Sequence, residues 1–588
     1  MAAPVLCGPV NDVARALADP QVEARGDILQ TEHPTRGLIR QVRSPVRGGD
    51  DPTDSRRGPF RNEHRREILG DLLGYDPGTV DWYRSQGAFG PPDQQRRKRG
   101  LMTVEMLTDL VIGGEIVAAR TGARIDDLDP ATGDQIAAVA DAAPDDVDAA
   151  IIAARRSQPA WAARHPRERG SVLVELARLI RAEAAGLAVL ESRDTGKPLS
   201  QAAADVEVAA QYFEFYGGFA DKMYGDTIPL GAGRLGYTVL EPRGVTAHII
   251  PWNYPLQIGS RTVAPSLMAG NACVVKPAEE APLTALVLAK LALDAGVPPG
   301  VLNVVPGRGE VAGAHLAASD GIDHISFTGG LETGRAVMGA AARNVKPVTL
   351  ELGGKSPSVI LADADLDRAL PVVAKALIQN AGQTCSAGTR VIAHSAVYDE
   401  VVERLALLLE KVSLGRGVDD PDMGPLITAA QRDRVTGYVD VGLAEGARVA
   451  GGGEAASVAG CEGGYFVRPT IFAGVTAGMR IANEEIFGPV LAALCCADER
   501  DGLAIANGTP FGLIASVWTR DIDRALWFSQ HLQAGQIYVN SYGAAGGVGL
   551  PFGGTKNSGF GREKGLEAIR ECTQTKTVVI EGNPSVLG

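Results

Sequence analysis

Cysteine is scarce in this sequence, and the few cysteines present do not form a metal site or a disulfide framework. The 588 residues include seven cysteines, an odd number, and no two of them form a CxxC pair. Zinc ribbons and disulfide scaffolds need closely spaced, paired cysteines, and the HExxH and DxDxDG metal motifs are also missing. We therefore expect a reduced, cytoplasmic protein without a metal.

Long apolar runs and an excess of basic charge are missing as well. No stretch approaches the roughly 20 apolar residues of a membrane span, and MAAPVLCGPVNDVAR lacks the basic and apolar regions of a secretory signal. The net charge is −13, which does not favour nonspecific binding to nucleic acids or anionic membranes. We expect a globular protein with no nucleic-acid and no membrane partner.

The charge is distributed unevenly along the chain. Residues 1–100 carry 16 Lys/Arg and 14 Asp/Glu, whereas the rest of the chain carries 41 and 56. The first part ends in GPPDQQRRKRG (90–100), whose composition is typical of a solvated linker. Met102 follows at once and opens a new pattern, so we predict a boundary there.

After this boundary, helical and strand patterns alternate. DDVDAAIIAARRSQPAW and ERGSVLVELARLIRAEAAGLAVL repeat apolar residues at helical spacing. GVTAHIIPW (244–252), ACVVKP (272–277) and VLNVVPG are short β-branched runs, and APLTALVLAKLALDAG between the last two has a helical pattern. This order predicts an α/β fold with a parallel sheet and helices on both faces.

Two glycine turns stand between a predicted strand and a predicted helix. GRGEVA (307–312) fits G-x-G-x-x-A, and FTGGLETG (327–334) opens a second helix. Helix N-termini attract phosphates, so a dinucleotide is plausible, although tight turns alone explain both strings. GGKS (353–356) is not a phosphate loop, because Thr349 stands where that motif needs glycine.

Cys385 and Glu351 are candidates for chemistry. Cys385 lies in GQTCSAG, a polar turn flanked by glycines, whereas Cys273 lies in an apolar run typical of buried cysteines. Glu351, in TLELGGKS, is a lone acid beside an apolar run, and an exposed strand end is the plain alternative for it. A Cys–His hydrolase is conceivable, but His394 and His531, the histidines after Cys385, lie in no motif.

Together these strings resemble the NAD(P)-dependent aldehyde dehydrogenase superfamily over about residues 103–583. The matching motifs occur in one collinear order. They are PWNYPL (251–256), KPAEE (276–280), FTGG (327–330), LELGGKSP (350–357), GQTCSAG (382–388), EEIFGPV (484–490) and PFGGTKNSGFGRE (551–563).

The resemblance implies a mechanism for three residues. Cys385 would attack the aldehyde as a thiolate, and Asn253 with the Cys385 backbone N–H would hold the oxyanion. After hydride transfer, Glu351 would activate the water that hydrolyses the thioester. Two alternatives stay open: a CoA-acylating semialdehyde dehydrogenase, disfavoured by Glu351, and a non-catalytic binding protein, disfavoured by the presence of all three residues.

The same resemblance implies a cofactor site. Lys276 and Glu279 match ribose contacts, and an acid there would repel a 2′-phosphate, so NAD is expected in preference to NADP. Gly330 departs from the family, where many members have Ser near the pyrophosphate. The full predicted set is Ile250, Trp252, Lys276, Glu279, Gly309, Gly329, Gly330, Leu352, Glu485 and Phe487.

Substrate contacts are implied less directly. Arg261 matches a carboxylate-binding arginine of succinic-semialdehyde-type members, whose second arginine is Gln379 here; a salt bridge inside the domain is the alternative for Arg261. After its first residue, Tyr542, the stretch YGAAGGVG (542–549) lacks the bulky aromatics that narrow the tunnel in many members, which suits a medium semialdehyde acid or a bulky aldehyde. The predicted substrate residues are Arg261, Tyr254, Thr384, Ser386 and Phe552.

The family fold implies three domains and a homodimer or homotetramer. We place the NAD-binding domain at 103–225 and 243–351, the catalytic domain at 352–565 and the β oligomerisation arm at 226–242 and 566–584. Residues 5–88 resemble instead the C-terminal end of a family III CoA-transferase, without its catalytic aspartate. We therefore interpret residues 1–101 either as a fused remnant plus linker or as an upstream gene end read through, with Met102 as the ordinary start, and expect no CoA-transferase activity.

Overall fold

The computed structural model describes residues 28–33, 37–42, 104–543 and 547–582. The chain divides into two compact units, residues 1–100 and 101–588, which are treated separately here. In the first unit, β1 (Ile28–His33) pairs antiparallel with β2 (Gly37–Val42). The predicted linker 90–100, Met102 and most of the CoA-transferase-like segment lie outside the described residues.

An eight-stranded sheet forms the centre of the first half of the second unit, in the order β23-β13-β12-β9-β10-β11-β3-β4. Its five inner strands are parallel, and antiparallel pairing occurs at the β3 and β23 sides. Every residue of β10 is buried, as expected for a parallel strand covered on both faces. The strands are β3 (Leu110–Ile112), β4 (Glu115–Val117), β9 (Val245–Ile249), β10 (Ala272–Lys276), β11 (Leu302–Val304), β12 (His324–Thr328), β13 (Val348–Glu351) and β23 (Gly559–Phe560).

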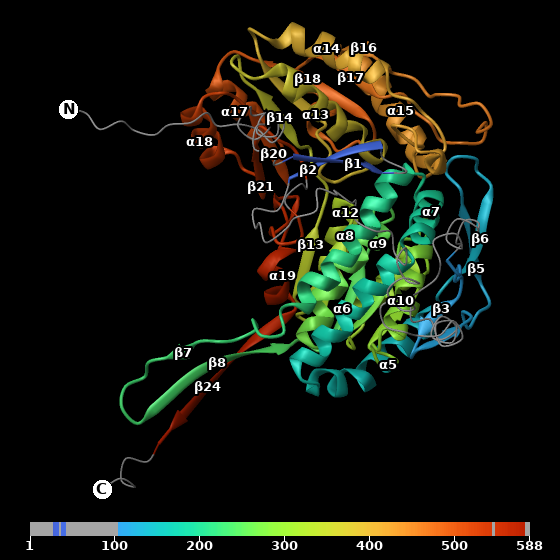
Figure 1. The fold of residues 1–588 in the computed structure, drawn as a ribbon, viewed down its shortest axis with the longest axis vertical. Helices are drawn as coiled ribbons and strands as arrows, with labels where there is room; N and C mark the ends of the chain where they lie inside the picture. The colour runs from blue at the N-terminus through green and yellow to red at the C-terminus, as the bar shows by residue number, and fades with distance from the viewer. Residues whose placement is uncertain (1–27, 34–36, 43–103, 544–546, 583–588) are drawn as a thin grey trace, which may run out of the picture. The chain divides into compact units, whose positions relative to one another are not determined.

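Helices cover both faces of this sheet (Figure 1). The run from Glu168 that reads as one helical pattern forms two helices, α6 and α7, which meet at Glu183. The helices of this half are α5 (Pro144–Ala163), α6 (Pro166–Ala182), α7 (Ala184–Thr195), α8 (Leu199–Gly217), α9 (Pro255–Ala269), α10 (Leu283–Asp294), η2 (Gly309–Gly313), α11 (Ala314–Ala318) and α12 (Leu331–Ala342), with the β5 (Arg124–Leu128) and β6 (Gln135–Ala140) hairpin beside them.

A seven-stranded sheet forms the second half, in the order β16-β17-β18-β15-β14-β20-β21. All of its pairs are parallel except β16 with β17. The strands are β14 (Pro357–Ile360), β15 (Arg390–His394), β16 (Arg448–Gly451), β17 (Thr470–Val475), β18 (Val490–Cys496), β20 (Ile514–Trp518) and β21 (Gln536–Val539), and a separate pair joins β19 (Phe511–Gly512) to β22 (Thr555–Lys556).

Helices flank this second sheet too. They are α13 (Leu366–Ile378), η3 (Gln379–Gly382), α14 (Tyr398–Glu410), α15 (Ala429–Ala444), α16 (Arg480–Asn483), α17 (Glu499–Asn507) and α18 (Ile522–His531). Two later elements contact the first half instead: η4 (Gly417–Asp419) contacts α7 and α8, and α19 (Gly565–Glu571) contacts α9. Two parallel sheets with helices on their faces confirm the predicted α/β fold class. None of the described helices is both long and apolar enough to cross a membrane.

A three-stranded ribbon projects from the helices α6 and α8 (Figure 1). It consists of β7 (Thr227–Ile228), β8 (Arg234–Pro242) and β24 (Thr573–Glu581). β24 pairs with β8 over nine residues, from Thr573 opposite Pro242 to Glu581 opposite Arg234. This ribbon lies where the sequence predicts an arm.

Candidate active site

The largest cleft that holds predicted site residues opens at the carboxyl ends of the parallel strands of the first sheet. After β9 the chain continues to β10 on one side, whereas β12 pairs on the other side of β9. Ligands of open α/β sheets bind at such a switch point. The cleft has a volume of about 770 Å³ and is lined by residues that follow β9, β12 and β13, including Asn253, Gly329, Glu351 and, from the second half, Cys385.

The loop that carries Cys385 has an unusual backbone. Asn380 and Ala381 have φ angles of 49° and 54°, and Gly382 has a φ of 73°. A Cβ on Gly382 would lie 2.3 Å from the carbonyl carbon of Gly488, so this turn needs glycine. Left-handed non-glycine residues persist only where the surroundings enforce them, which indicates that the loop is held in one geometry.

Side chains from the preceding half of the chain hold this loop. Asn253 Nδ2 donates to the Gln383 carbonyl at 2.9 Å, and Asn380 Nδ2 donates to the Asn253 carbonyl at 3.1 Å. A carboxamide has two N–H donors, so Asn253 retains one for an oxyanion. Asn253 is 3% exposed and lies in the cleft next to Cys385.

The thiol and the carboxyl group in the cleft are both desolvated. Burial raises the pKa of Cys385 to about 12, although the Arg261 charge opposes this rise. Burial, reinforced by the nearby Glu563 charge, also raises the pKa of Glu351 well above its usual range. Glu351 is 2% exposed, and neither of its oxygens has a hydrogen-bond partner in the described part of the chain. It is therefore not an exposed strand end.

Arg261 lies on α9, as the helical pattern predicts, but its charge already has a partner. Its Nε is 2.5 Å from Glu563 Oε2, and both side chains are 5% exposed. Ser326 Oγ donates to the other oxygen of Glu563 at 2.9 Å. The structure thus shows a salt bridge in place of a free carboxylate-binding arginine. Glu563 lies in the range predicted for the catalytic domain, but it follows β23, which pairs with β13 of the first sheet.

Of four predicted cofactor residues, Glu485 lines the cleft, whereas Lys276, Glu279 and Gly309 form a separate polar group outside its lining. Lys276 Nζ is 2.9 Å from Glu279 Oε2, and Gly309 N donates to the other Glu279 oxygen at 3.2 Å. Burial raises the pKa of Glu485 to about 7, and its Oε1 accepts from Gly354 N at 3.0 Å.

Some of the remaining cofactor candidates line the cleft, and the others are buried behind it. Trp252 and Phe487 line the cleft with their rings edge to face, 5.3 Å apart. Gly329 and Gly330 also line it, and a Cβ on Gly330 would meet open space. Ile250 and Leu352 are 3% and 4% exposed and do not line the cleft.

The predicted substrate residues surround Cys385 away from the cofactor candidates. Tyr254 Oη is 2.9 Å from Thr384 Oγ1, and the Ser386 carbonyl accepts from Tyr542 Oη at 2.8 Å. Cys385 packs against a small apolar cluster that contains Phe552. Residues 544–546 of the predicted open stretch lie outside the described residues.

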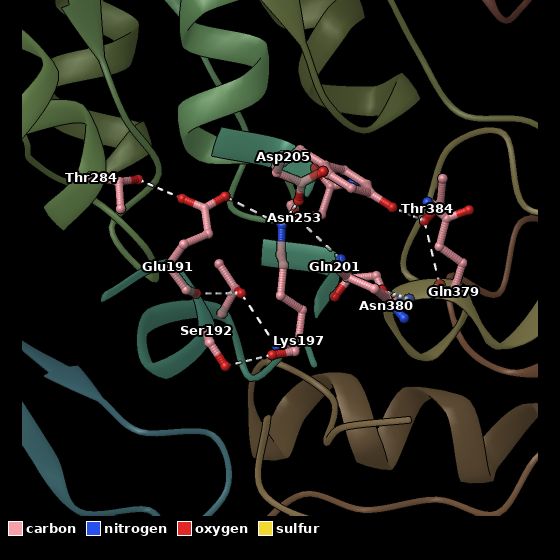
Figure 2. Close-up of polar contacts among 12 residues, drawn as sticks. Glu191, Ser192, Lys197, Gln201, Asp205, Asn253, Thr284, Gln379, Asn380 and Thr384 are labelled. Carbon is pink, nitrogen blue, oxygen red and sulfur yellow. Dashed lines mark hydrogen bonds and ion pairs between the residues drawn. The ribbon is translucent and has the colours of Figure 1, made fainter. Parts of the chain in front are cut away.

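A buried lysine behind Tyr254 has no counterpart among the predicted residues. Figure 2 shows Lys197 between Asp205 and Glu191, with its Nζ at 2.6 and 3.3 Å from their oxygens. The same Nζ lies 4.3 Å from the centroid of the Tyr254 ring. The only signal in the sequence is a lysine after a Thr-Gly turn, which carries no indication of its partners.

Comparisons with known proteins agree with this site. The model of the aldehyde dehydrogenase family matches residues 116–578, and that of CoA-transferase family III matches residues 1–65. A betaine aldehyde dehydrogenase of Mesorhizobium japonicum is 43% identical over 472 residues, which are 80% of this chain and 96% of the relative.

Two solved structures show the same fold. A putative aldehyde dehydrogenase from Burkholderia cenocepacia is 49% identical, with a TM-score of 0.79 over 81% of this chain and 100% of its own. A betaine aldehyde dehydrogenase point mutant from Staphylococcus aureus, solved with NAD⁺, is 34% identical, with a TM-score of 0.80 over 82% and 98%. With the family model matching most of its length and a thiol, a carboxamide and a carboxyl group meeting in one cleft, this chain belongs to the aldehyde dehydrogenase family.

Proposed function

We propose that the protein oxidises an aldehyde to the carboxylic acid with NAD, through a thioester on Cys385. The observation that carries the proposal is the convergence of Cys385, Asn253 and Glu351 in one cleft with Glu485 and Phe487. Nucleophile, oxyanion donor, base and cofactor contacts are the parts that this reaction requires.

The cleft fits a dinucleotide. Glu279 keeps acceptor capacity for ribose hydroxyls beside Lys276 and the Gly309 N–H, and its carboxylate would repel a 2′-phosphate, which favours NAD over NADP. Glu485 and Phe487 would hold the nicotinamide riboside, and Gly329 and Gly330 leave space for the pyrophosphate. NAD, when bound, accepts the hydride from the substrate carbon.

The chain's own residues perform the other steps. Cys385 loses its proton and adds to the carbonyl carbon, while the oxygen takes the electron pair and is held by the free Asn253 N–H and the Cys385 N–H. After hydride loss, Glu351 takes a proton from water, whose oxygen forms the acid as the sulfur leaves. Because the pKa of the free thiol is raised, a nearby base must receive its proton, and Glu351 in the same cleft can do so. Glu351 then releases this proton to solvent before it takes one from water, and the departing thiolate is reprotonated at the end of the cycle.

Loss of the thiol tests this mechanism most directly. We expect Cys385→Ala to abolish NADH formation at 340 nm with any aldehyde while NAD still binds, since the thiol forms the intermediate and does not hold the cofactor. Assays with and without CoA distinguish hydrolysis from acyl transfer to CoA. Substantial turnover by the variant would refute the assignment of the nucleophile.

We also propose that the β7–β8–β24 ribbon assembles a homodimer or homotetramer. Leu235, Val579 and Ile580 on it are 48%, 59% and 51% exposed, and paired strands with exposed apolar side chains favour addition to a partner's sheet. Light scattering should give a dimer or tetramer mass, and Val579→Lys with Ile580→Lys should shift it towards the monomer.

A further inference from the structure

Two of the aromatic side chains near the nucleophile, Phe552 and Tyr254, have cations of the chain itself over their rings. Arg261 Cζ and Lys564 Nζ each lie 5.0 Å from the centroid of the Phe552 ring. Lys197 Nζ lies 4.3 Å from the centroid of the Tyr254 ring. Quaternary ammonium groups are recognised by aromatic faces within about 6 Å, and both rings here have a cation within that distance.

These three cations are not equally compensated. Lys197 has two carboxylate partners, Glu191 and Asp205, and Arg261 has Glu563. Lys564 is 8% exposed, yet no carboxylate lies within ion-pair distance of it in the described part of the chain. Two cations, Arg261 and Lys564, therefore lie around Phe552. The acids near Lys564 are Glu563, which is already paired with Arg261, and Glu351.

The charge of Lys564 acts where an aldehyde must bind. Under the proposed function the carbonyl carbon bonds to Cys385 Sγ, and Cys385 packs against the cluster that contains Phe552. In betaine aldehyde one methylene separates the carbonyl carbon from the ammonium nitrogen, so the two atoms are about 2.5 Å apart. The substrate cation would be fixed beside the nucleophile and could not move away from these charges.

We propose that the protein takes aldehydes without a positive charge and discriminates against quaternary-ammonium aldehydes, with Lys564 as the residue that sets this specificity. The proposal rests on the proposed function. It separates this chain from its relatives that are named betaine aldehyde dehydrogenases. Lys564 Nζ lies 5.0 Å from the centroid of Phe552, which packs beside Cys385. Taking a separation of about 6 Å on this scale and an effective dielectric constant near 20, repulsion between the two like charges disfavours binding by roughly 100-fold.

A matched pair of substrates tests the proposal. Betaine aldehyde and 3,3-dimethylbutanal have the same shape, and they differ in that the first has a quaternary nitrogen where the second has a quaternary carbon. The ratio of their kcat/KM values therefore isolates the effect of the charge. Each concentration is first corrected for the fraction of the aldehyde that is hydrated. We expect the wild-type protein to prefer the neutral aldehyde by roughly 30- to 100-fold. Equal or faster oxidation of betaine aldehyde would overturn the proposal. Loss of the proposed function itself would appear as no NADH from either aldehyde.

Variants of Lys564 assign the effect to this side chain. Lys564→Met should raise kcat/KM for betaine aldehyde, relative to that for the neutral aldehyde, about tenfold or more. Lys564→Arg keeps the charge and should keep the wild-type ratio. The control is Lys411→Met, which removes an exposed lysine at the C-terminal cap of α14. The ratio cancels any general change in turnover. An unchanged ratio in Lys564→Met would exclude Lys564 as the determinant.

The pH dependence of the ratio offers a second measurement. Burial, with Arg261 nearby, lowers the pKa of Lys564 to about 8, so its charge is present below pH 8 and lost above it. Ionisation of Glu351, whose pKa burial raises, would also favour the cationic aldehyde as the pH rises. The same profile is therefore recorded for Lys564→Met, and the change in the wild-type protein should exceed that in the variant. Discrimination should therefore weaken between pH 7 and pH 9.5, and a constant ratio would contradict the role of Lys564.

Discussion

The two sides of the nucleophile differ in whether their buried polar groups have partners. On the cleft side, Asn253 Oδ1 and both oxygens of Glu351 are buried and have none within the described residues. On the side behind Tyr254, Lys197 is held by Asp205 and Glu191, and Thr284 Oγ1 donates to Glu191 at 2.7 Å (Figure 2). Unsatisfied buried groups cost stability. Such groups also occur elsewhere in the described residues, but Asn253 and Glu351 line a cleft, where a ligand can satisfy them.

The largest expected effect comes from the unsatisfied carboxyl group. Glu351→Gln should give one burst of NADH per active site followed by turnover about 10²- to 10⁴-fold slower, since a general base contributes on this scale. Thermal unfolding should not fall, because the substitution removes a buried acid without a partner. Stopped-flow absorbance at 340 nm and calorimetry measure the two effects; an unchanged steady-state rate would point to another base.

Removing the paired lysine, in contrast to Glu351→Gln, should lower the stability of the fold. Lys197→Met leaves Asp205 and Glu191 buried without their cation, which typically costs about 3–5 kcal/mol of unfolding free energy. Denaturant unfolding measures this loss. The triple variant Lys197→Met, Glu191→Gln, Asp205→Asn should recover much of it, and its failure to recover stability would show that charge pairing is not the cause.

Asn253 combines the two kinds of group, since its side chain both supports the loop of Cys385 and faces the cleft. Asn253→Ala removes an oxyanion donor and should lower kcat by about 10²- to 10³-fold. It also removes the bond to the Gln383 carbonyl, so a modest fall in stability should accompany it. Asn253→Asp keeps the size of the side chain but loses both N–H donors, and a loss of less than threefold in kcat for either variant would contradict the assignment.

The smallest effect is expected in the first unit. Deletion of residues 1–101 should leave specific activity and thermal unfolding unchanged within error, because every residue of the proposed site lies after that point. Loss of activity or solubility would show that this segment supports the enzyme unit.

Contiguous motifs made much of the site predictable from sequence. Cys385, Glu351 and Asn253 each lie in a short string with a specific pattern, and alternating helical and strand patterns predict the α/β class. Whether Glu351 is exposed was not predictable, since burial depends on how β13 packs in the sheet. Nor did helical spacing show where α6 ends and α7 begins.

The supporting charges could not be found in this way, because their partners lie on other elements of the fold. Arg261 on α9 meets Glu563, which lies just before α19, and Lys197 meets the face of Tyr254 on another segment. Only tertiary packing brings these groups together. The sequence around a charged residue does not show whether a group of opposite charge lies beside it in the fold. This property distinguishes Lys197, which has two carboxylate partners, from Lys564.

The pairing of β24 with β8 has a consequence for how the protein is made. Arg234 and Glu581 form an ion pair at the far end of this ribbon although 347 positions separate them in the chain, and β23 likewise joins the first sheet from near the C-terminus. Synthesis runs from the N-terminus, so β8 has no partner strand until β24 has also been made. Completion of the first sheet, of the ribbon and of any assembly built on it therefore follows the synthesis of all the elements between β8 and β24, and these non-local pairings are expected to form late in folding.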